Sequence, residues 1–402
     1  MLRPLTPLSC PPSARPERVA ERADVPMKDQ RNETLANILL TYSIDLQPGD
    51  KLFLEIRGWE SLELAREVIR QATRLGGVPF WWYNDPWLGR PWVDGASEEQ
   101  MKAFGEMHLM LAKECDAWLG FYASDNAFEL SGVDPEQMKL HQKLYVEPVQ
   151  LRERVMNTKW CLLTYPTNSM AQLAEMSKEG FEDFYYDVCC LDYARMSQAM
   201  DRVAELMSST DQVHIVSRGT DLTFSIKGMG VAKCDGRENI PDGEVFTAPI
   251  KDSVNGHITF NVPAMERGSV FNEINLRFED GKAIEASCQG GTEKLNEVLD
   301  VDEGARYTGE FALGVNPHML RPMQNPLFDE KMAGSLHLAL GYCVEEAFNG
   351  NESGIHWDLV LDQREENGGG ELYFDGELVR KDGMFVDQEL EESFSAEALR
   401  AK

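Results

Sequence analysis

The sequence lacks a long apolar run. No segment of the 402-residue chain approaches the roughly 20 consecutive apolar residues that a membrane-spanning helix needs. The first 26 residues are rich in proline and arginine, and they also lack the apolar segment of a secretory signal. We therefore exclude an integral membrane protein. We expect a disordered leader over 1–26, with Met27 as an alternative start of the chain.

Positive charge and closely spaced cysteines are scarce as well. The formal net charge is −29, and so acidic a surface repels nucleic-acid phosphate and anionic lipid. We expect neither nucleic acid nor a membrane as a partner. The eight cysteines form no CxxC pair and show no spacing typical of a structural zinc site or a disulfide framework. This usage favours a reducing, cytoplasmic location.

Several well-known catalytic motifs are missing. The chain contains no H-E-x-x-H zinc motif, and Ser253 in "KDSVNGHITF" lacks the G-x-S-x-G surroundings of a hydrolase nucleophile. His257 in the same segment is interpreted as structural. The glycine-rich stretches "GGTEKL" and "NGGGEL" follow neither the P-loop nor the dinucleotide-binding spacing. Nucleotide binding is therefore not expected.

The first half of the chain has the pattern of an α/β domain. From about residue 30 to 210, amphipathic helices alternate with short apolar strands, which predicts a mostly parallel sheet covered by helices. We expect strands at 51–56, 78–83, 117–123 and 159–166. A helix is expected over 61–77, another over 101–115, and a long helix over 184–209.

The second half is predicted to be predominantly β. After about residue 211 the pattern changes to short alternating strands, and D-G pairs in "EDGK" and "ELYFDGELVRKDGMFV" indicate hairpin turns. The expected fold class is therefore α/β plus β-rich. An N-terminal α/β domain covers 27–210, and a C-terminal, predominantly β domain of the α+β type covers 211–402.

An aromatic run, "PFWWYNDPWLGRPW" (79–92), contains four of the eight tryptophans. The favoured interpretation is a strand in the core followed by a packed loop. The alternative is a platform for a planar substrate.

Residues of metal-binding type stand in apolar surroundings in the second half. Burying an unpaired charge costs several kcal/mol unless it is paired or bound to a metal. In a strand, residues two apart share a face, so the histidine and aspartate of "SGIHWDLV" can reach one ion. Carboxylates with imidazoles match a zinc, cobalt or manganese site, and this many ligands is compatible with one ion or a pair. The candidates are Glu244, Glu310, His337, His356 and Asp358.

The competing interpretation is structural. A single histidine on an apolar strand is more often a hydrogen-bonded core residue than a metal ligand. The H-x-D pair at His356 and Asp358 favours a ligand role more strongly than either residue alone, because a surface ion pair needs no apolar flanks. Spacing by itself leaves both interpretations open.

Longer motifs around these residues resemble a known family. "GRENIPDGEVFTAPIKDSVNGHITFN", "DEGARYTGEFALGVNP", "FDEKMAGSLHLALG" and "NGNESGIHWDLV" are similar, in this order, to the dinuclear metallo-aminopeptidases that include aminopeptidases T, S and II, metallopeptidase family 29. The resemblance extends over about 27–386. It implies that the five candidates bind the metals, that the metals activate water and polarise a peptide carbonyl, and that the chain forms a homodimer acting on peptides.

One position departs from that family. Seven residues after the first metal-binding histidine its members usually carry a tyrosine suited to stabilising the oxyanion, whereas this chain has Val344. Losing one such donor costs on the order of 10²–10³ in rate. Tyr342 is the nearest substitute, and Glu310 is a candidate proton shuttle; these two are the expected catalytic residues.

The departure leaves two activities open. The first is an aminopeptidase. The second is an aminohydrolase of a small amino-aromatic compound such as a nitroanthranilate, a chemistry found in the same superfamily. Ring-opening dioxygenases of that superfamily differ at the positions of Glu244 and Glu310, where they have an apolar residue and a histidine. Both glutamates are kept here, which favours hydrolysis.

Overall fold

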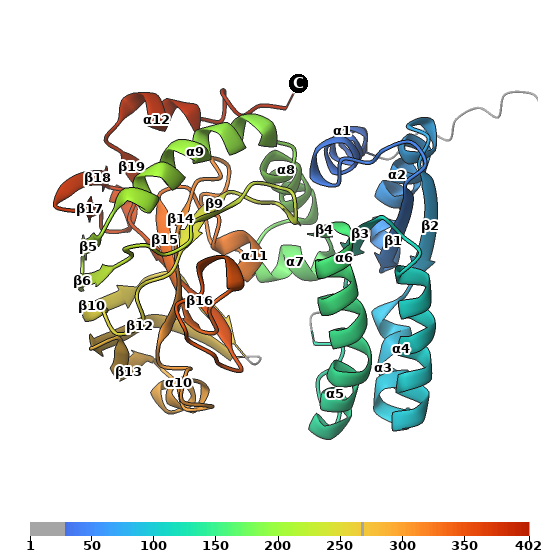
Figure 1. Cartoon of the computed structure of the whole chain (residues 1–402), viewed down its shortest axis with the longest axis horizontal. Coiled ribbons are helices and arrows are strands. Elements are labelled where there is room, and N and C mark those ends of the chain that lie inside the picture. The colour runs from blue at the N-terminus through green and yellow to red at the C-terminus, as the bar shows by residue number, and fades with distance from the viewer. Residues whose placement is uncertain (1–28, 127, 267–268, 402) are drawn as a thin grey trace, which may run out of the picture.

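A computed structural model describes residues 29–126, 128–266 and 269–401, so the expected leader over 1–26 and Met27 lie outside the described residues. Figure 1 shows two lobes side by side. The N-terminal lobe contains the parallel strands β1 to β4, and the C-terminal lobe contains the antiparallel strands with α9 and α12 on one side. The fold class expected from the sequence, α/β plus β-rich, is confirmed.

A parallel sheet forms the centre of the N-terminal lobe. Its strand order is β2-β1-β3-β4-β8, and each adjacent pair is parallel. The last strand of this sheet comes from beyond residue 210, the expected domain boundary. The bounds are β1 Lys51–Arg57, β2 Val78–Tyr83, β3 Ala117–Tyr122, β4 Lys159–Thr164 and β8 Asn239–Ile240.

Helices cover both faces of this sheet because successive apolar residues of its strands point to opposite faces. Leu52 and Leu54 join the main core with α1 and α2, whereas Phe53 belongs to a separate cluster with α4 and η3. The helices of this lobe are α1 Arg31–Ile38, η1 Leu39–Ser43, η2 Trp59–Ser61, α2 Leu62–Arg74, α3 Pro86–Gly95, α4 Glu98–Ala112, α5 Pro135–His141, the π-helix η3 Gln142–Arg154, α6 Val155–Asn157 and α7 Asn168–Leu173.

The long helix expected over 184–209 is two helices, α8 Lys178–Cys189 and α9 Tyr193–Ser209. Cys190 leaves the helical region with φ −94° and ψ 62°, and Asp192 caps α9 by accepting from Arg195 N over 3.1 Å. An aspartate at this position stabilises the start of a new helix. The apolar pattern of the sequence thus continues across a real break between two helices.

The aromatic run over 79–92 serves two environments. Trp82 and Trp92 pack against Phe104, with ring centroids 6.3 and 4.5 Å apart, so this part is core as favoured from the sequence. Trp81 and Trp87, in contrast, are 58% and 74% exposed. Trp81 lies on the edge strand β2 and Trp87 on α3, so the expectation of a core strand followed by a packed loop is wrong for these two exposed residues, and the expected loop is a helix.

A large antiparallel sheet lies on the outside of the C-terminal lobe. Its order is β11-β12-β10-β6-β5-β17-β18-β19, with β13 paired to β12. The expected D-G hairpin turns are confirmed: Asp280, Asp375 and Asp382 each have positive φ and are followed by glycine. The bounds are β5 Gln212–Ser217, β6 Thr220–Ser225, β10 Asn255–Phe260, β11 Ala264–Glu266, β12 Ser269–Glu279, β13 Lys282–Gln289, β17 Gly370–Phe374, β18 Glu377–Lys381 and β19 Met384–Phe385.

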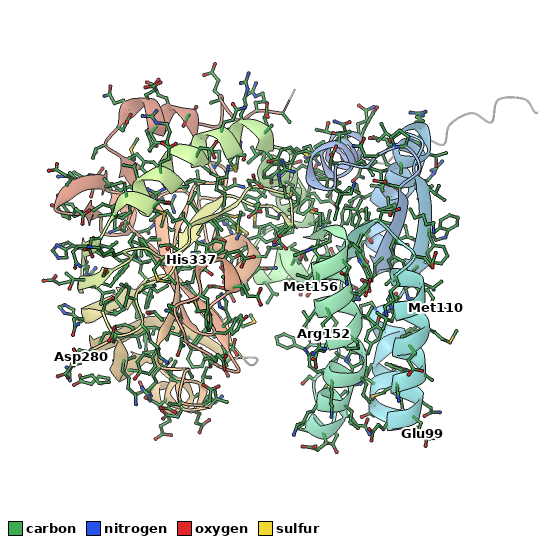
Figure 2. All side chains as sticks on the ribbon, viewed as in Figure 1. Glu99, Met110, Arg152, Met156, Asp280 and His337 are labelled. Carbon is green, nitrogen blue, oxygen red and sulfur yellow. The ribbon has the colours of Figure 1, made fainter. Side chains whose placement is uncertain are left out.

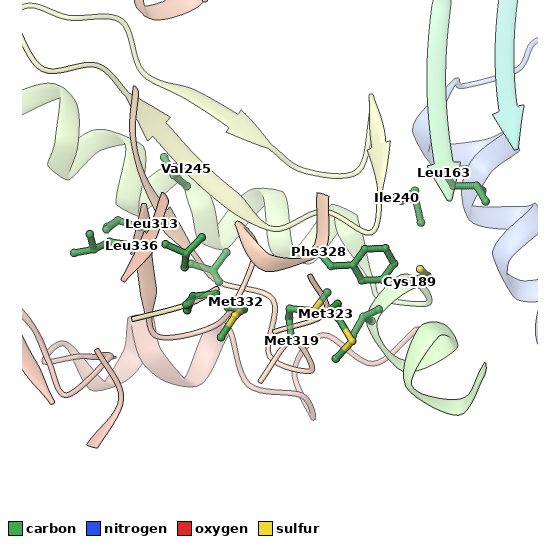
Figure 3. Packing of buried hydrophobic residues seen from close by; sticks show 14 of the residues in the cluster. Leu163, Cys189, Ile240, Val245, Leu313, Met319, Met323, Phe328, Met332 and Leu336 are labelled. Atoms are coloured by element: carbon green, nitrogen blue, oxygen red, sulfur yellow. The ribbon is translucent and has the colours of Figure 1, made fainter. Parts of the chain in front are cut away.

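A second antiparallel sheet lies deeper in this lobe, in the order β16-β15-β14-β9-β7. Figure 3 shows its apolar residues Val245, Leu313 and Leu336 continuing through Phe328 to Ile240, which lies in the last strand of the parallel sheet. One core therefore links the two lobes. The bounds are β7 Ala232–Cys234, β9 Glu244–Thr247, β14 Thr308–Gly314, β15 Ser335–Gly341 and β16 His356–Asp362.

Short helices complete the C-terminal lobe. They are α10 Thr292–Leu299, α11 Pro326–Asp329, η4 Glu345–Ala347, η5 Glu365–Asn367 and α12 Gln388–Ser393. Among the described residues, no helix combines the length and apolar character needed to cross a membrane.

Candidate metal centre

The five candidate ligands lie on one face of the inner sheet. Strand pairing places His356 opposite Gly341, Asp358 opposite Ala339 and Glu310 also opposite Ala339, while His337 pairs with Ala312 and Glu244 with Gly314. Residues of one parity on each strand share a face. Trp357 has the opposite parity, and it is buried against Phe271 with ring centroids 5.3 Å apart.

The functional atoms of these side chains converge. His337 Nε2 lies 3.1 Å from Glu310 Oε1, 3.7 Å from Glu244 Oε2 and 3.8 Å from Asp358 Oδ1. His356 Nε2 lies 3.4 Å from Asp358 Oδ1 and 3.6 Å from Glu310 Oε2. The structure thus brings together all five residues singled out in the sequence. Figure 2 shows His337 in the interior of the C-terminal lobe.

The side chains form two overlapping groups. Glu244, Glu310 and His337 each offer a ligand atom within 4.8 Å of the others, and so do Glu310, His356 and Asp358. Glu310 belongs to both groups, with Oε1 nearer His337 and Oε2 nearer His356. A carboxylate in this position can bridge two ions.

Burial and charge compete at this site. Burial alone would lower the pKa of His337, but its hydrogen bond to Glu310 and the charges of Glu244 and Asp358 raise that pKa to about 9. Burial opposes protonation of His356 in the same way, and Asp358 with Glu310 raises its pKa to about 10. Burial also raises the pKa of Glu310. The surrounding carboxylates thus favour positive charge at both imidazoles.

The donor set fits a divalent metal ion. Glu244 Oε2, Asp358 Oδ1 and His337 Nδ1 are buried without a hydrogen-bond partner among the described residues, and unpaired buried polar atoms are costly. Three carboxylates and two imidazoles are ligands that zinc, cobalt and manganese accept. Glu244 Oε2 and Asp358 Oδ1 lie in the same cluster as the Nε2 atoms of both histidines. The charge of a cation bound there would therefore be balanced by carboxylates on more than one side.

His356 is held in a defined orientation. Its Nδ1 lies 2.7 Å from the main-chain oxygen of Tyr342. If Nδ1 carries the proton and donates it to that carbonyl, the Nε2 lone pair points at Asp358 and Glu310. Histidine ligands commonly use such a hydrogen bond to fix their tautomer.

A cavity of about 430 Å³ opens beside the cluster. Its wall includes Glu244, Glu310, Phe246, Cys234 and Val344. Val344, at the position where members of the family usually carry a tyrosine, thus lies in the wall of this cavity. Tyr342 is 37% exposed, and its contact with the cluster runs through its carbonyl to His356.

Three further charged residues were missed in the sequence. The buried Lys331 Nζ lies 2.6 Å from Glu244 Oε1, 2.7 Å from Glu330 Oε1 and 3.5 Å from Asp242 Oδ1. The available signal was the "DEK" triplet between Phe328 and Met332, two residues of the core. His257, interpreted as structural, is exposed on β10.

Comparison with known proteins shows the family to which this chain belongs. A family model described as thermophilic metalloprotease (M29) matches residues 28–385. The chain is 27% identical to aminopeptidase 2 of Geobacillus stearothermophilus, over 87% of this chain and 94% of that protein. It is 30% identical to aminopeptidase AmpS of Bacillus subtilis, over 84% of this chain and 94% of that protein.

A solved structure shows the same fold. Wild-type AmpT from Thermus thermophilus superposes with a TM-score of 0.74 at 24% identity, covering 89% of this chain and 99% of that one. At this identity the match concerns the arrangement of the elements.

Proposed function

The chain belongs to the M29 family of thermophilic metalloproteases, and from this membership we propose a metal-dependent aminopeptidase that releases N-terminal amino acids from peptides. The observation that carries the proposal is the pair of ligand groups joined through Glu310. The relatives named above are aminopeptidases, so the aromatic aminohydrolase considered from the sequence is not favoured.

We propose that Glu244, Glu310, His337, His356 and Asp358 are the metal ligands. These residues would hold one or two divalent ions, of zinc, cobalt or manganese, with Glu310 belonging to both groups. When bound, such ions lower the pKa of water and polarise a carbonyl. The buried Lys331 holds one oxygen of Glu244, which leaves Oε2 directed toward His337.

We propose two catalytic residues. Glu310 is the first: it lies in the cavity wall, and a carboxylate oxygen that is not bound to an ion would accept a proton from the attacking water and pass it to the leaving amine. Tyr342 is the proposed oxyanion donor, because Val344 carries no hydroxyl and Tyr342, two residues earlier, does. Its carbonyl also positions His356.

Three further features belong to the proposal. A homodimer is expected from the family resemblance. The cytoplasm is the proposed location, because the seven cysteines among the described residues are free thiols, as is usual in a reducing compartment. The division into domains near residue 210 stays a prediction, with β8 lending its two residues to the N-terminal sheet.

The test compares two substrates. The purified protein is incubated with manganese, cobalt or zinc and either leucyl-p-nitroanilide or 5-nitroanthranilate, and release of nitroaniline or ammonia is followed. We expect nitroaniline release that a chelator abolishes and metal restores. Ammonia release from 5-nitroanthranilate without peptide turnover would reverse the assignment. Metal binding without either reaction would contradict both activities.

A further inference from the structure

A second cavity lies in the N-terminal lobe, where the parallel strands end. The order β2-β1-β3-β4 places the reversal of strand order between β1 and β3. In open parallel sheets, ligands bind outside the carboxyl ends of the strands at this reversal. Arg57 ends β1, Tyr122 ends β3, and the two residues are paired in the sheet. Both line the cavity.

The cavity combines an apolar wall with a few polar groups. Its volume is about 310 Å³, at the lower end of the range of small-molecule sites. The polar groups belong to Arg57, Asn84, Tyr122, His141, Tyr145, Gln150 and Arg154. The apolar wall comes from α3, η3, β4 and the segment before α5, through Val93, Leu130, Val146, Leu151 and Leu162.

Arg154 is buried without full compensation. It is 6% exposed, its Nε donates to Gln150 O over 3.0 Å, and its guanidinium lies 4.8 Å from the centre of the Trp160 ring. Its Nη1 is buried with no hydrogen-bond partner among the described residues. Burial lowers the pKa of Arg154, with Tyr122 and Glu55 opposing the shift.

The nearby carboxylate is already paired. Glu55 Oε1 lies 2.7 Å from Arg57 Nη2, and Gln150 Nε2 donates to Glu55 Oε2 over 3.2 Å. Burial lowers the pKa of His108 to about 4 and also lowers the pKa of His141, so burial favours the neutral form of both rings. Arg57 is therefore paired with a carboxylate, whereas Arg154 forms no ion pair with the described residues, in a chain whose net charge is −29.

We propose that this cavity binds a small carboxylate with an apolar body. A carboxylate accepts from a guanidinium in a planar geometry and brings one negative charge, which matches the single uncompensated arginine. A phosphate group would bring up to two negative charges, which the one unpaired guanidinium, that of Arg154, would not balance. The apolar body would lie against Val146, Leu151 and Leu162. The proposal does not depend on the activity of the metal centre.

The test measures binding of defined probes to the full chain by titration calorimetry. The probes are benzoate and hexanoate, with neutral benzamide and inorganic phosphate as comparisons. We expect saturable binding of benzoate or hexanoate at one site per chain, at least 10-fold tighter than benzamide or phosphate. This comparison uses the unmodified protein, so it does not depend on any variant folding.

Variants then locate the site. Arg154→Gln is expected to weaken carboxylate binding at least 10-fold, and Arg154→Lys to weaken it less. Arg152→Gln is the matched control, because Arg152 lies in the same helix, is exposed and pairs with Glu147. His356→Ala is expected to retain binding, which separates this cavity from carboxylate binding at the metals.

Four results would overturn the proposal. They are no saturable binding of either carboxylate, equal binding of benzamide, tighter binding of phosphate, and unchanged affinity in folded Arg154→Gln. Loss of binding in His356→Ala would place the carboxylate at the metal centre instead.

Discussion

Lys331 donates a hydrogen bond from Nζ to Glu244 Oε1 over 2.6 Å, and both side chains are buried. The same Nζ lies 2.7 Å from Glu330 Oε1 and 3.5 Å from Asp242 Oδ1. Lys331 thus offsets three carboxylates beside the proposed metal ligands. The charge of the metal site is therefore balanced in part by a residue that binds no metal.

Lys331→Met should destabilise the metal-free protein by about 3–5 kcal/mol, because it leaves buried carboxylates without a partner. The loss should be smaller with manganese bound, since the ion then compensates Glu244. Urea unfolding with and without the metal measures both values. Lys227→Met is the control, because Lys227 is exposed and pairs with Asp211 at the surface. An equal loss with and without metal would contradict the assigned role.

His356→Ala should remove both bound metal and peptidase activity, because it deletes one of the five proposed ligands. Metal analysis after gel filtration, with activity on leucyl-p-nitroanilide, measures the two effects. His257→Ala is the matched control, since His257 is exposed on β10. A variant with its full metal content would remove His356 from the ligand set.

Tyr342→Phe should lower kcat by about 10²–10³ with metal retained, which is the usual effect of losing one oxyanion donor. Adding Val344→Tyr to this variant should restore part of the rate, because Val344 lines the cavity. Val344→Phe in the same background supplies the ring without the hydroxyl and should restore nothing. An unchanged kcat in Tyr342→Phe would show that Tyr342 is not the donor.

The clustering of the five candidates could be anticipated from the sequence because each stands among small or apolar residues, although spacing alone left a structural interpretation open and the family resemblance implied the ligand set. That local contrast places Glu310 or His337 on a buried face without any knowledge of the partner strands. Lys331 gave a weaker signal, since charged triplets such as "DEK" are common at surfaces. Its burial depends on Glu244, which is 87 residues away.

The parallel sheet was predictable for the same reason, since its first four strands are apolar runs between amphipathic helices. The fifth strand, β8, has two residues, Asn239 and Ile240, and exists through pairing with Leu162 and Leu163. So short a strand has no periodicity to detect. The break between α8 and α9 was missed because a cap at Asp192 interrupts an apolar pattern that continues on both sides.

His108 should make stability depend on pH between about 4 and 6.5. Burial lowers its pKa to about 4, although the nearby Glu55 opposes the shift, so the folded protein favours the neutral ring. The unfolded chain, with an ordinary histidine pKa, binds the proton first as pH falls. The stabilisation is therefore complete above about pH 6.5 and is lost progressively toward pH 4, by about 3 kcal/mol.

His108→Phe tests this dependence. Phenylalanine keeps the stacking with Phe53 and Trp82, whose ring centroids lie 5.1 and 5.4 Å from His108. It removes the hydrogen bond to Tyr145 OH, a cost that is the same at every pH in this window. Urea unfolding of both proteins from pH 7 to 4 gives the difference. The unfolding free energy of the unmodified protein should fall relative to that of His108→Phe by up to about 3 kcal/mol between pH 7 and 4. Two parallel curves would show that His108 does not titrate differently in the folded state.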